Sequence, residues 1–255
     1  MKRFEDKTVI VTGGGGGIGS ASCLRLAAEG ARVAVLDRDL DTAQKTVEAV
    51  RQAGGQAAAF ACDITDRAQV DAAVAAVQAQ FGPVSALVNN AGWDVFKPFL
   101  KTSPAEWEKL IAINLTGALH MLHAVLPGMV ERGYGRVVNV ASDAARGGSS
   151  GEAVYSACKG GLLALSKTLA REHARHAITV NAVCPGPTDT ALLADVAEGA
   201  RDPAKLIEAF RSAIPLGRLG QGDDLASAIA FFASDDAGFV TGQVLSVSGG
   251  LTMHG

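Results

Sequence analysis

The sequence predicts an α/β domain in which a parallel β-sheet carries helices on both of its faces. Short runs rich in valine and isoleucine alternate with longer amphipathic segments along the 255 residues, which is typical of repeated strand–helix–strand units. Hydrophobic residues make up 48% of the chain and charged residues 19%, and this composition excludes a disordered chain. No linker rich in proline or serine interrupts the pattern, so we expect a single domain over residues 1–255.

Seven short apolar runs are the expected strands. Each is bounded by glycine, proline or aspartate and is apolar without strict alternation, as in strands that are buried on both faces. They cover residues 8–12, 32–37, 56–62, 84–89, 136–141, 179–184 and 243–247.

Helical segments fill the intervals between these strands, with clear examples over residues 65–81 and 104–132. The second follows Ser103, Pro104 and Glu106, which together form a capping box with proline at the first helical position. The interval 185–215 is the one long stretch without an expected strand. In a compact α/β domain such a segment is usually a lid or substrate loop, although a surface excursion would give the same pattern.

The charge and composition exclude several classes of protein. The chain has 23 basic and 26 acidic residues and few aromatic ones, so we expect no nucleic-acid partner. The charged N-terminus lacks the apolar stretch of a signal peptide, and no run approaches about 18 apolar residues, so we expect a cytoplasmic protein with no membrane span. Four scattered cysteines and five histidines without a ligand pattern predict free thiols and no bound metal.

A glycine-rich loop follows the first expected strand and opens a helix. Five glycines, an isoleucine and a sixth glycine occupy residues 13–19, so the backbone can approach a pyrophosphate at the positive end of the helix dipole. Asp37 ends the second strand, 18 residues after Gly19, where a carboxylate can accept both hydroxyls of an adenosine ribose. The same carboxylate would repel a 2′-phosphate, which predicts NAD over NADP, although the guanidinium of Arg38 could pair with that phosphate.

Further motifs follow in a specific order along the chain. They are Cys-Asp-Ile at 62–64, Asn-Asn-Ala-Gly at 89–92, Asn114, Ser142, Tyr155, Lys159 and Pro-Gly at 185–186. With the glycine loop, they make the chain resemble the short-chain dehydrogenase/reductase family over essentially its whole length. The resemblance implies a Rossmann-type, doubly wound sheet of seven parallel strands and a nicotinamide cofactor. It also implies a homotetramer whose dimer faces are the long helices starting near Pro104 and Glu152.

Tyr155 and Lys159 are the expected catalytic pair. Because they are four residues apart in a helical segment, they share one helix face. A neighbouring ammonium and a positively charged nicotinamide would lower the pKa of the phenol, so that Tyr155 could take a proton from an alcohol. Ser142 ends a strand and could polarise the substrate oxygen. The resemblance adds Asn114, which would hold a water beside the lysine.

The cofactor contacts follow from the glycine loop and from positions that match the family. The pyrophosphate and adenosine ribose would meet Gly13, Gly15, Gly16, Gly17, Ile18, Asp37 and Arg38. The adenine and the adjoining cleft would meet Asp63, Ile64, Asn90, Ala91 and Gly92. The nicotinamide end would meet Tyr155, Lys159, Pro185, Gly186 and Thr188.

The substrate residues are expected in three stretches that follow the fourth, fifth and sixth strands. They include Trp93, Asp94, Arg146, Ser149 and Leu192, and their apolar members would suit an alicyclic or acyl group. The phosphates of a CoA thioester would need basic partners, and the candidates are Arg146, Arg201, Lys205, Arg211 and Arg218. Acidic residues outnumber basic ones between 188 and 218, however, as on a solvated helix face.

These observations predict an NAD-dependent oxidoreductase that interconverts a secondary alcohol and a ketone, with a hydroxyacyl-CoA as its substrate class. One alternative is a 3-oxoacyl-[acyl-carrier-protein] reductase, which commonly carries a basic residue where this glycine loop has Gly16. Another is a dehydrogenase of a free alcohol, sugar or steroid. From a different class, an inactive NAD-binding sensor or scaffold would usually lack the tyrosine or the lysine.

Overall fold

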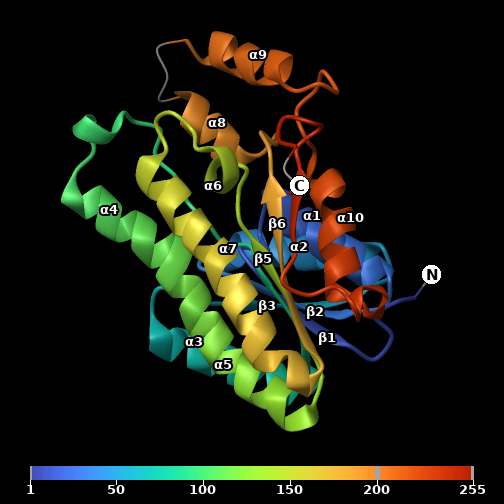
Figure 1. The fold of residues 1–255 in the computed structure, drawn as a ribbon. Helices are drawn as coiled ribbons and strands as arrows, with labels where there is room; N and C mark the ends of the chain where they lie inside the picture. Colours follow the sequence, from blue (N-terminus) through green and yellow to red (C-terminus); the bar gives the residue numbers. More distant parts are fainter. Residues whose placement is uncertain (1, 199–201, 254–255) are drawn as a thin grey trace.

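The computed structural model describes residues 2–198 and 202–253, and its sheet runs through the middle of the molecule (Figure 1). In the described residues, seven parallel strands lie in the order β3-β2-β1-β4-β5-β6-β7. They are β1 (Thr8–Thr12), β2 (Arg32–Asp37), β3 (Gln56–Ala61), β4 (Val84–Asn89), β5 (Gly135–Val140), β6 (Ile178–Pro185) and β7 (Val244–Val247). The prediction of a seven-stranded parallel sheet is confirmed, and each expected boundary lies within one residue of the observed one.

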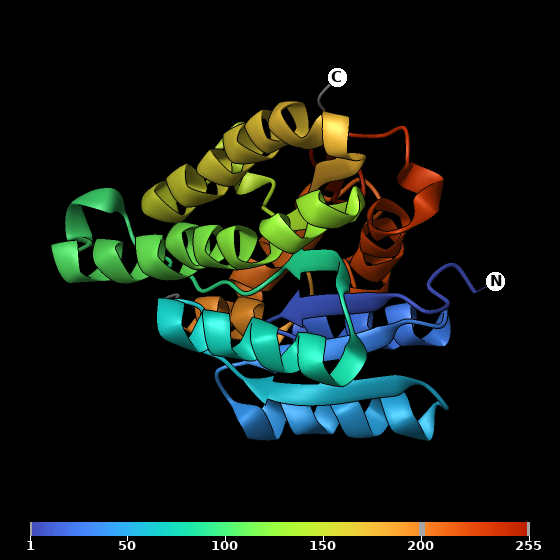
Figure 2. The same ribbon diagram turned by 90° about the horizontal axis from the view of Figure 1, so that it is seen from below.

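Helices cover both faces of the sheet (Figures 1 and 2). One apolar layer joins α1 (Gly17–Ala28), α2 (Leu40–Gln52) and α10 (Gly222–Ala233) to the sheet. The opposite layer joins α3 (Arg67–Phe81), α5 (Gly117–Arg132) and α7 (Ala153–His173). Within β1, Val9 and Val11 belong to the first layer and Ile10 to the second. Both strand faces are therefore buried, which explains why the strands are continuously apolar.

The strand order reverses between β1 and β4. From β1 the chain moves outward to β2 and β3 and then crosses back to β4, which pairs with the other side of β1. Loops after neighbouring strands diverge at such a point and leave a crevice at the carboxyl edge of the sheet. Helices α8 (Ala191–Glu198) and α9 (Pro203–Ala213) from the interval 185–215 lie beyond this edge (Figure 1).

The expected helix over residues 104–132 consists of three parts. A π-helical turn, η2 (Ala112–Thr116), separates α4 (Pro104–Ile111) from α5, and the predicted capping box is present at Ser103. By length and composition alone, Pro104–Arg132 is long and apolar enough to cross a membrane, a test that a core helix also passes. In the fold, 44% of its most apolar window is buried, because α5 packs against α3 and β4.

Arg136 joins several segments at the amino-terminal edge of the sheet. Its buried guanidinium donates hydrogen bonds to the carbonyl oxygens of Ser234 (3.2 Å) and Ala177 (3.1 Å). It also forms an ion pair with Asp235 at 3.2 Å and lies over the Tyr134 ring. These carbonyl groups belong to different connections, so one side chain holds three parts of this edge together.

We predict that Arg136→Met lowers the free energy of unfolding by about 2–4 kcal/mol, because buried carbonyl groups lose their donor. Urea unfolding followed by circular dichroism measures this change. The matched control is Arg67→Met, which removes an exposed ion pair with Asp71 and should cost less than about 1 kcal/mol. Equal losses in the two variants would contradict a structural role for the Arg136 network.

Candidate active site

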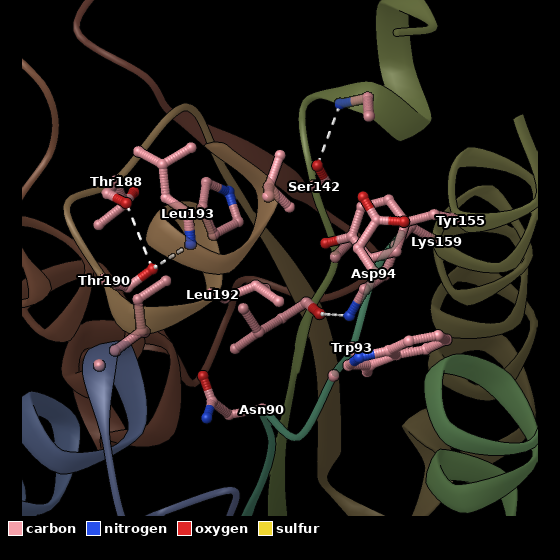
Figure 3. Close-up of a pocket in the computed structure, with 18 of the residues that line it drawn as sticks. Asn90, Trp93, Asp94, Ser142, Tyr155, Lys159, Thr188, Thr190, Leu192 and Leu193 are labelled. Carbon is pink, nitrogen blue, oxygen red and sulfur yellow. Dashed lines mark hydrogen bonds between the residues drawn. The ribbon is translucent and has the colours of Figure 1, made fainter. Parts of the chain in front are cut away.

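A cavity of about 950 Å³ opens at the carboxyl edge of the sheet (Figure 3). Its walls come from the loops after β1 to β6 and from helices α8 and α9. All of the expected site residues line it except Gly15, Asn114 and Arg146. The tertiary structure therefore brings together residues that are distributed over more than half of the sequence.

The glycine loop leaves its backbone open toward this cavity. Gly13 has a φ of +61°, and a Cβ atom there would lie 2.8 Å from the Cα of Ala91. A Cβ atom on Gly19 would lie 2.1 Å from the carbonyl oxygen of Gly13, so α1 can approach the loop only without a side chain at this position. Asn90 donates from Nδ2 to the carbonyl oxygens of Thr12 (3.0 Å) and Gly13 (3.1 Å), which fixes the loop against β4. The N-terminus of α1 thus faces the cavity with a bare backbone, which fits a pyrophosphate.

Asp37 is held at the end of β2 by two backbone donors. Its Oδ2 accepts from the N–H of Gly15 at 3.0 Å, and its Oδ1 accepts from the N–H of Asp39 at 3.1 Å. A Cβ atom on Gly15 would lie 2.9 Å from Asp37 Oδ2, so this glycine supports Asp37 rather than lining the cavity. Arg38 lines the cavity beside it. A fixed carboxylate at this strand end fits the adenosine ribose of a dinucleotide.

The residues expected to contact the adenine also line the cavity. Asp63 and Ile64 line the cavity after β3, and Asp63 Oδ1 accepts from the N–H of Thr65 at 2.9 Å. The carbonyl oxygen of Ile64 lies 2.9 Å from Nδ1 of His120, so α5 supports this loop. Pro185, Gly186 and Thr188 lie at the other end of the cavity, after β6, where the nicotinamide end is expected.

Ser142, Tyr155 and Lys159 meet in the middle of the cavity wall (Figure 3). Lys159 is 2% exposed, and its ammonium donates to the carbonyl oxygen of Val140 at 2.9 Å and lies 5.6 Å from the centre of the Tyr155 ring. Ser142 lies two residues after β5, and its hydroxyl is near enough to the Tyr155 phenol to lower its pKa. These three side chains can bind one oxygen atom of a substrate between two hydroxyl groups, with a cation close by.

The environment of the free chain does not favour a phenolate. Burial raises the pKa of Tyr155, the carboxyl groups of Asp94 and Glu152 raise it further, and the hydrogen bond with Ser142 opposes them. Burial also lowers the pKa of Lys159 to about 8. The expected lowering of the phenol pKa included a bound, positively charged nicotinamide; in the chain by itself desolvation outweighs the effect of Ser142. A positively charged nicotinamide in the cavity would act in the opposite direction.

Asn114 lies in the π-helical turn, behind the cavity wall. It donates from Nδ2 to the carbonyl oxygens of Trp93 (2.7 Å) and Leu110 (3.0 Å), and its Oδ1 accepts from the N–H of Trp93 at 3.2 Å. A Cβ atom on Gly92 would lie 3.1 Å from Asn114 Oδ1 and 3.3 Å from Lys159 Nζ. Asn114 thus clamps the loop after β4, a contact that the helical pattern of the sequence did not reveal.

The substrate side of the cavity differs partly from expectation. Trp93, Asp94, Ser149 and Leu192 line it, whereas Arg146 donates to Ser246 Oγ at 2.9 Å behind the wall. Three of the other basic residues proposed for a CoA group do not line the cavity, and the fourth, Arg201, lies outside the described residues. Arg211 pairs with Glu208, Arg218 pairs with Asp224, and Lys205 is exposed in the first turn of α9.

Two charged wall residues were not singled out as site residues in the sequence, although Glu152 lies in the stretch after the fifth strand that was expected to enclose the substrate. Lys109 lies in the last turn of α4 and places its ammonium 3.8 Å from the centre of the Trp93 ring, at the cavity wall. Glu152 precedes α7 and lines the cavity three residues before Tyr155. No local motif marks either residue, because only the packing of α4 and α7 beside the loop after β4 brings them to the site. In the described part of the chain, no group of three His, Cys, Asp or Glu side chains could hold a metal ion.

Comparison with known proteins agrees with this geometry. The family model described as "Enoyl-(Acyl carrier protein) reductase" matches residues 14–252. The chain belongs to the short-chain dehydrogenase/reductase family. It is therefore an oxidoreductase of alcohol and keto groups that uses a nicotinamide cofactor, and its fold is of the Rossmann type.

Three relatives illustrate the range of the family near this chain. Acetoacetyl-CoA reductase of Rhizobium meliloti (strain 1021) is 41% identical over 245 residues, which cover 96% of this chain and 98% of that protein. The (2S)-[(R)-hydroxy(phenyl)methyl]succinyl-CoA dehydrogenase subunit BbsD of Thauera aromatica is 38% identical over 250 residues and covers 98% of both. A crystal structure of an actinorhodin polyketide ketoreductase variant with NADPH superposes with a TM-score of 0.93 at 36% identity, over 97% of this chain and 98% of that one.

We predict that Tyr155→Phe lowers kcat by about 10³-fold or more, because the hydroxyl that exchanges the proton is lost. Steady-state kinetics measure the loss, and cofactor binding by fluorescence should stay within about threefold of the wild type. The chain has two tyrosines, so Tyr134→Phe, at the opposite edge of the sheet, is the matched control and should keep its activity. Retained turnover in Tyr155→Phe would rule out this residue as the proton carrier.

Proposed function

We propose that this enzyme oxidises the ring hydroxyl of 2-hydroxycyclohexane-1-carboxyl-CoA to the 2-oxo thioester with NAD. Residues 89–99, 142–161 and 184–196 are similar to 2-hydroxycyclohexanecarboxyl-CoA dehydrogenase, an enzyme of anaerobic cyclohexanecarboxylate and benzoate degradation. The observation that carries the proposal is that these three stretches supply most of the substrate side of the cavity wall. The apolar residues among them, such as Trp93, Phe96 and Leu192, suit an alicyclic ring. Relatives named for CoA-thioester substrates support the same substrate class.

In the proposed reaction, Ser142 and Tyr155 hold the substrate hydroxyl. Tyr155 accepts its proton, and Ser142 stabilises the charge that develops on the oxygen. Bound NAD accepts a hydride from the carbinol carbon. Lys159, fixed by the carbonyl oxygen of Val140, holds the nicotinamide ribose and keeps a positive charge beside the phenol. Asn114 holds the loop after β4 and supports a water beside Lys159.

We propose NAD rather than NADP because of Asp37. Its carboxylate is fixed by the backbone N–H groups of Gly15 and Asp39, so it cannot turn away from a 2′-phosphate. A relative's structure contains NADPH, so the fold can accept a cofactor with a 2′-phosphate. The glycine loop of this chain has room for a side chain at Gly16 but carries no basic residue there. Arg38 alone would have to neutralise the phosphate against the adjacent carboxylate.

A second candidate function is reduction of a 3-oxoacyl thioester. The acetoacetyl-CoA reductase relative, at 41% identity, favours it. The same Ser142, Tyr155 and Lys159 would return a proton to a ketone oxygen. The two candidates differ in the shape of the acyl group and in the direction of the reaction, and both substrates are thioesters.

We further propose that the enzyme is a cytoplasmic homotetramer. Ile111 on α4 is 43% exposed and Leu119 on α5 is 41% exposed, on the helices expected to form a dimer face. An apolar residue that is left exposed on a long helix is typical of a surface that another subunit covers.

We predict that the wild type reduces NAD rapidly with 2-hydroxycyclohexane-1-carboxyl-CoA and slowly with its free acid. The absorbance of the reduced nicotinamide follows the reaction. Acetoacetyl-CoA with NADH or NADPH, assayed in parallel, tests the second candidate. Absence of turnover with the ring thioester would remove the ring substrate from the proposal, and faster turnover of acetoacetyl-CoA would favour the second candidate.

We predict that Asp37→Ser raises the ratio of kcat/KM for NADP to that for NAD by about 100-fold, because the repulsion of the 2′-phosphate is removed. Kinetics with both cofactors at one substrate concentration measure the ratio. Asp41→Ser removes an exposed carboxylate from the first turn of α2 and is the matched control. A wild type that prefers NADP would contradict the role given to Asp37.

A further inference from the structure

Two carboxyl groups meet in the cavity wall beside the catalytic tyrosine. Asp94 lies in the loop after β4 and is 8% exposed, and Glu152 precedes α7 by one residue. Both line the cavity, and the Glu152 carboxyl lies near enough to Asp94 to raise its pKa. Figure 3 shows Asp94 between Trp93 and the Tyr155–Lys159 pair. Neither carboxyl group has a part in the proton transfer described above.

The backbone holds these two groups together. Asn114 clamps the backbone of Trp93, and the N–H of Val95 donates to Asp94 Oδ1 at 2.7 Å. The N–H of Lys97 donates to the carbonyl oxygen of Gly151 at 2.9 Å, which joins the loop of Asp94 to the segment of Glu152. This bond joins the backbone segments that carry the two carboxyl groups, so the fold places both segments at the same part of the cavity wall.

The arrangement requires a shared proton. Asp94 Oδ2 is buried and has no donor among the residues that the structure describes. Two ionised carboxylates offer only acceptors and repel each other, so one of them retains its proton in a poorly solvated site. Burial, and then the Glu152 carboxyl, raise the pKa of Asp94 to about 8, while the positive charge of Lys159 opposes them. At neutral pH Asp94 therefore retains its proton.

We propose that the Asp94–Glu152 pair recognises the acyl group of the substrate: Asp94 donates its proton in a hydrogen bond to the neutral thioester carbonyl, and the acidic group of Glu152 beside it excludes the free carboxylate. This inference rests on the proposed function, in which the substrate is an acyl thioester. In a 3-hydroxyacyl or 2-hydroxycycloalkane-carboxyl thioester, one carbon separates the carbinol carbon from the acyl carbonyl carbon. When Ser142 and Tyr155 hold the hydroxyl, the acyl oxygen therefore reaches the neighbouring wall, where Asp94 lies.

The pair also acts on Tyr155. Two titratable groups on α7, the ammonium of Lys159 and the phenol of Tyr155, face the carboxyl pair. The thiol of Cys184 on β6 faces the phenol as well. Asp94 and Glu152 both raise the pKa of Tyr155, so neutralising the pair makes the phenol easier to ionise. This coupling gives a measurement that needs no substrate.

The first test compares each thioester with its own free acid in Asp94→Ala, Asp94→Asn and Glu152→Gln. We expect Asp94→Ala to lower kcat/KM for the thioester about 10- to 100-fold, because the carbonyl oxygen loses its donor. We expect Glu152→Gln, which keeps the Asp94 carboxyl as a donor but removes the second acidic group, to raise kcat/KM for the free acid. Asp94→Asn, which keeps an N–H donor and leaves Glu152 in place, should recover part of the thioester turnover and keep the exclusion of the acid.

Glu108→Gln is the matched control, since Glu108 is exposed on α4 and outside the cavity. It should leave the thioester preference unchanged. A preference that is unchanged in Asp94→Ala would overturn the inference, as would an equal loss for both substrates in a variant that still binds NAD. If the wild type turns over no thioester, the proposed function fails first, and the acyl role of the pair fails with it.

The second test follows the ionisation of Tyr155 directly. In a Tyr134→Phe background it is the one tyrosine left in the chain, so the ultraviolet absorbance of phenolate reports on it alone. With NAD bound, Asp94→Asn should lower the pH midpoint of this absorbance by about one pH unit, because a neighbouring negative charge is removed. A midpoint that does not move would show that the pair is not charged beside Tyr155 and would overturn the proposal.

Discussion

The reversal of strand order between β1 and β4 is the constraint on which the rest of the site depends. Parallel strands need crossover helices, and helices on both faces bury the sheet completely, so the strand ends remain as the place where polar groups can gather. At the reversal, the loops after β1 and β4 separate and open the cavity. The loops must then pass one another closely, and a Cβ atom on Gly13 would lie 2.8 Å from the Cα of Ala91. The glycine loop is thus required by the packing of the fold as well as by a pyrophosphate.

Burial determines the charge states at this edge. The same enclosure that brings Ser142, Tyr155 and Lys159 together raises the pKa of the phenol and lowers that of the ammonium to about 8. The free chain therefore holds the reacting groups in their neutral forms more readily than an exposed pair would. A bound cation opposes desolvation, so in the proposed mechanism the cofactor both accepts the hydride and favours the phenolate.

Asn114 connects several of these features. The side-chain amide of Asn114, in the π-helical turn, points toward the loop after β4. There it forms hydrogen bonds with both the N–H and the carbonyl oxygen of Trp93. That loop carries Asp94 toward Glu152, and its glycine, Gly92, leaves space beside Lys159. A single asparagine thus supports the wall on the substrate side and the surroundings of the catalytic lysine.

The sequence by itself determined the sheet, the glycine loop and the identity of the central site residues. The spacing of apolar residues and the positions of the glycines are local properties of the sequence, so they can be recognised in a single chain. The order of the motifs implied the family. The division of 104–132 by a π-helical turn was decided by the contact of Asn114 with a distant loop. Tertiary packing also decided that Lys109 and Glu152 line the cavity wall, and that Arg146 binds Ser246 instead of lining the cavity. The direction of the Tyr155 pKa shift also depended on tertiary structure, because it reflects how deeply the phenol is buried and which carboxyl groups packing places beside it.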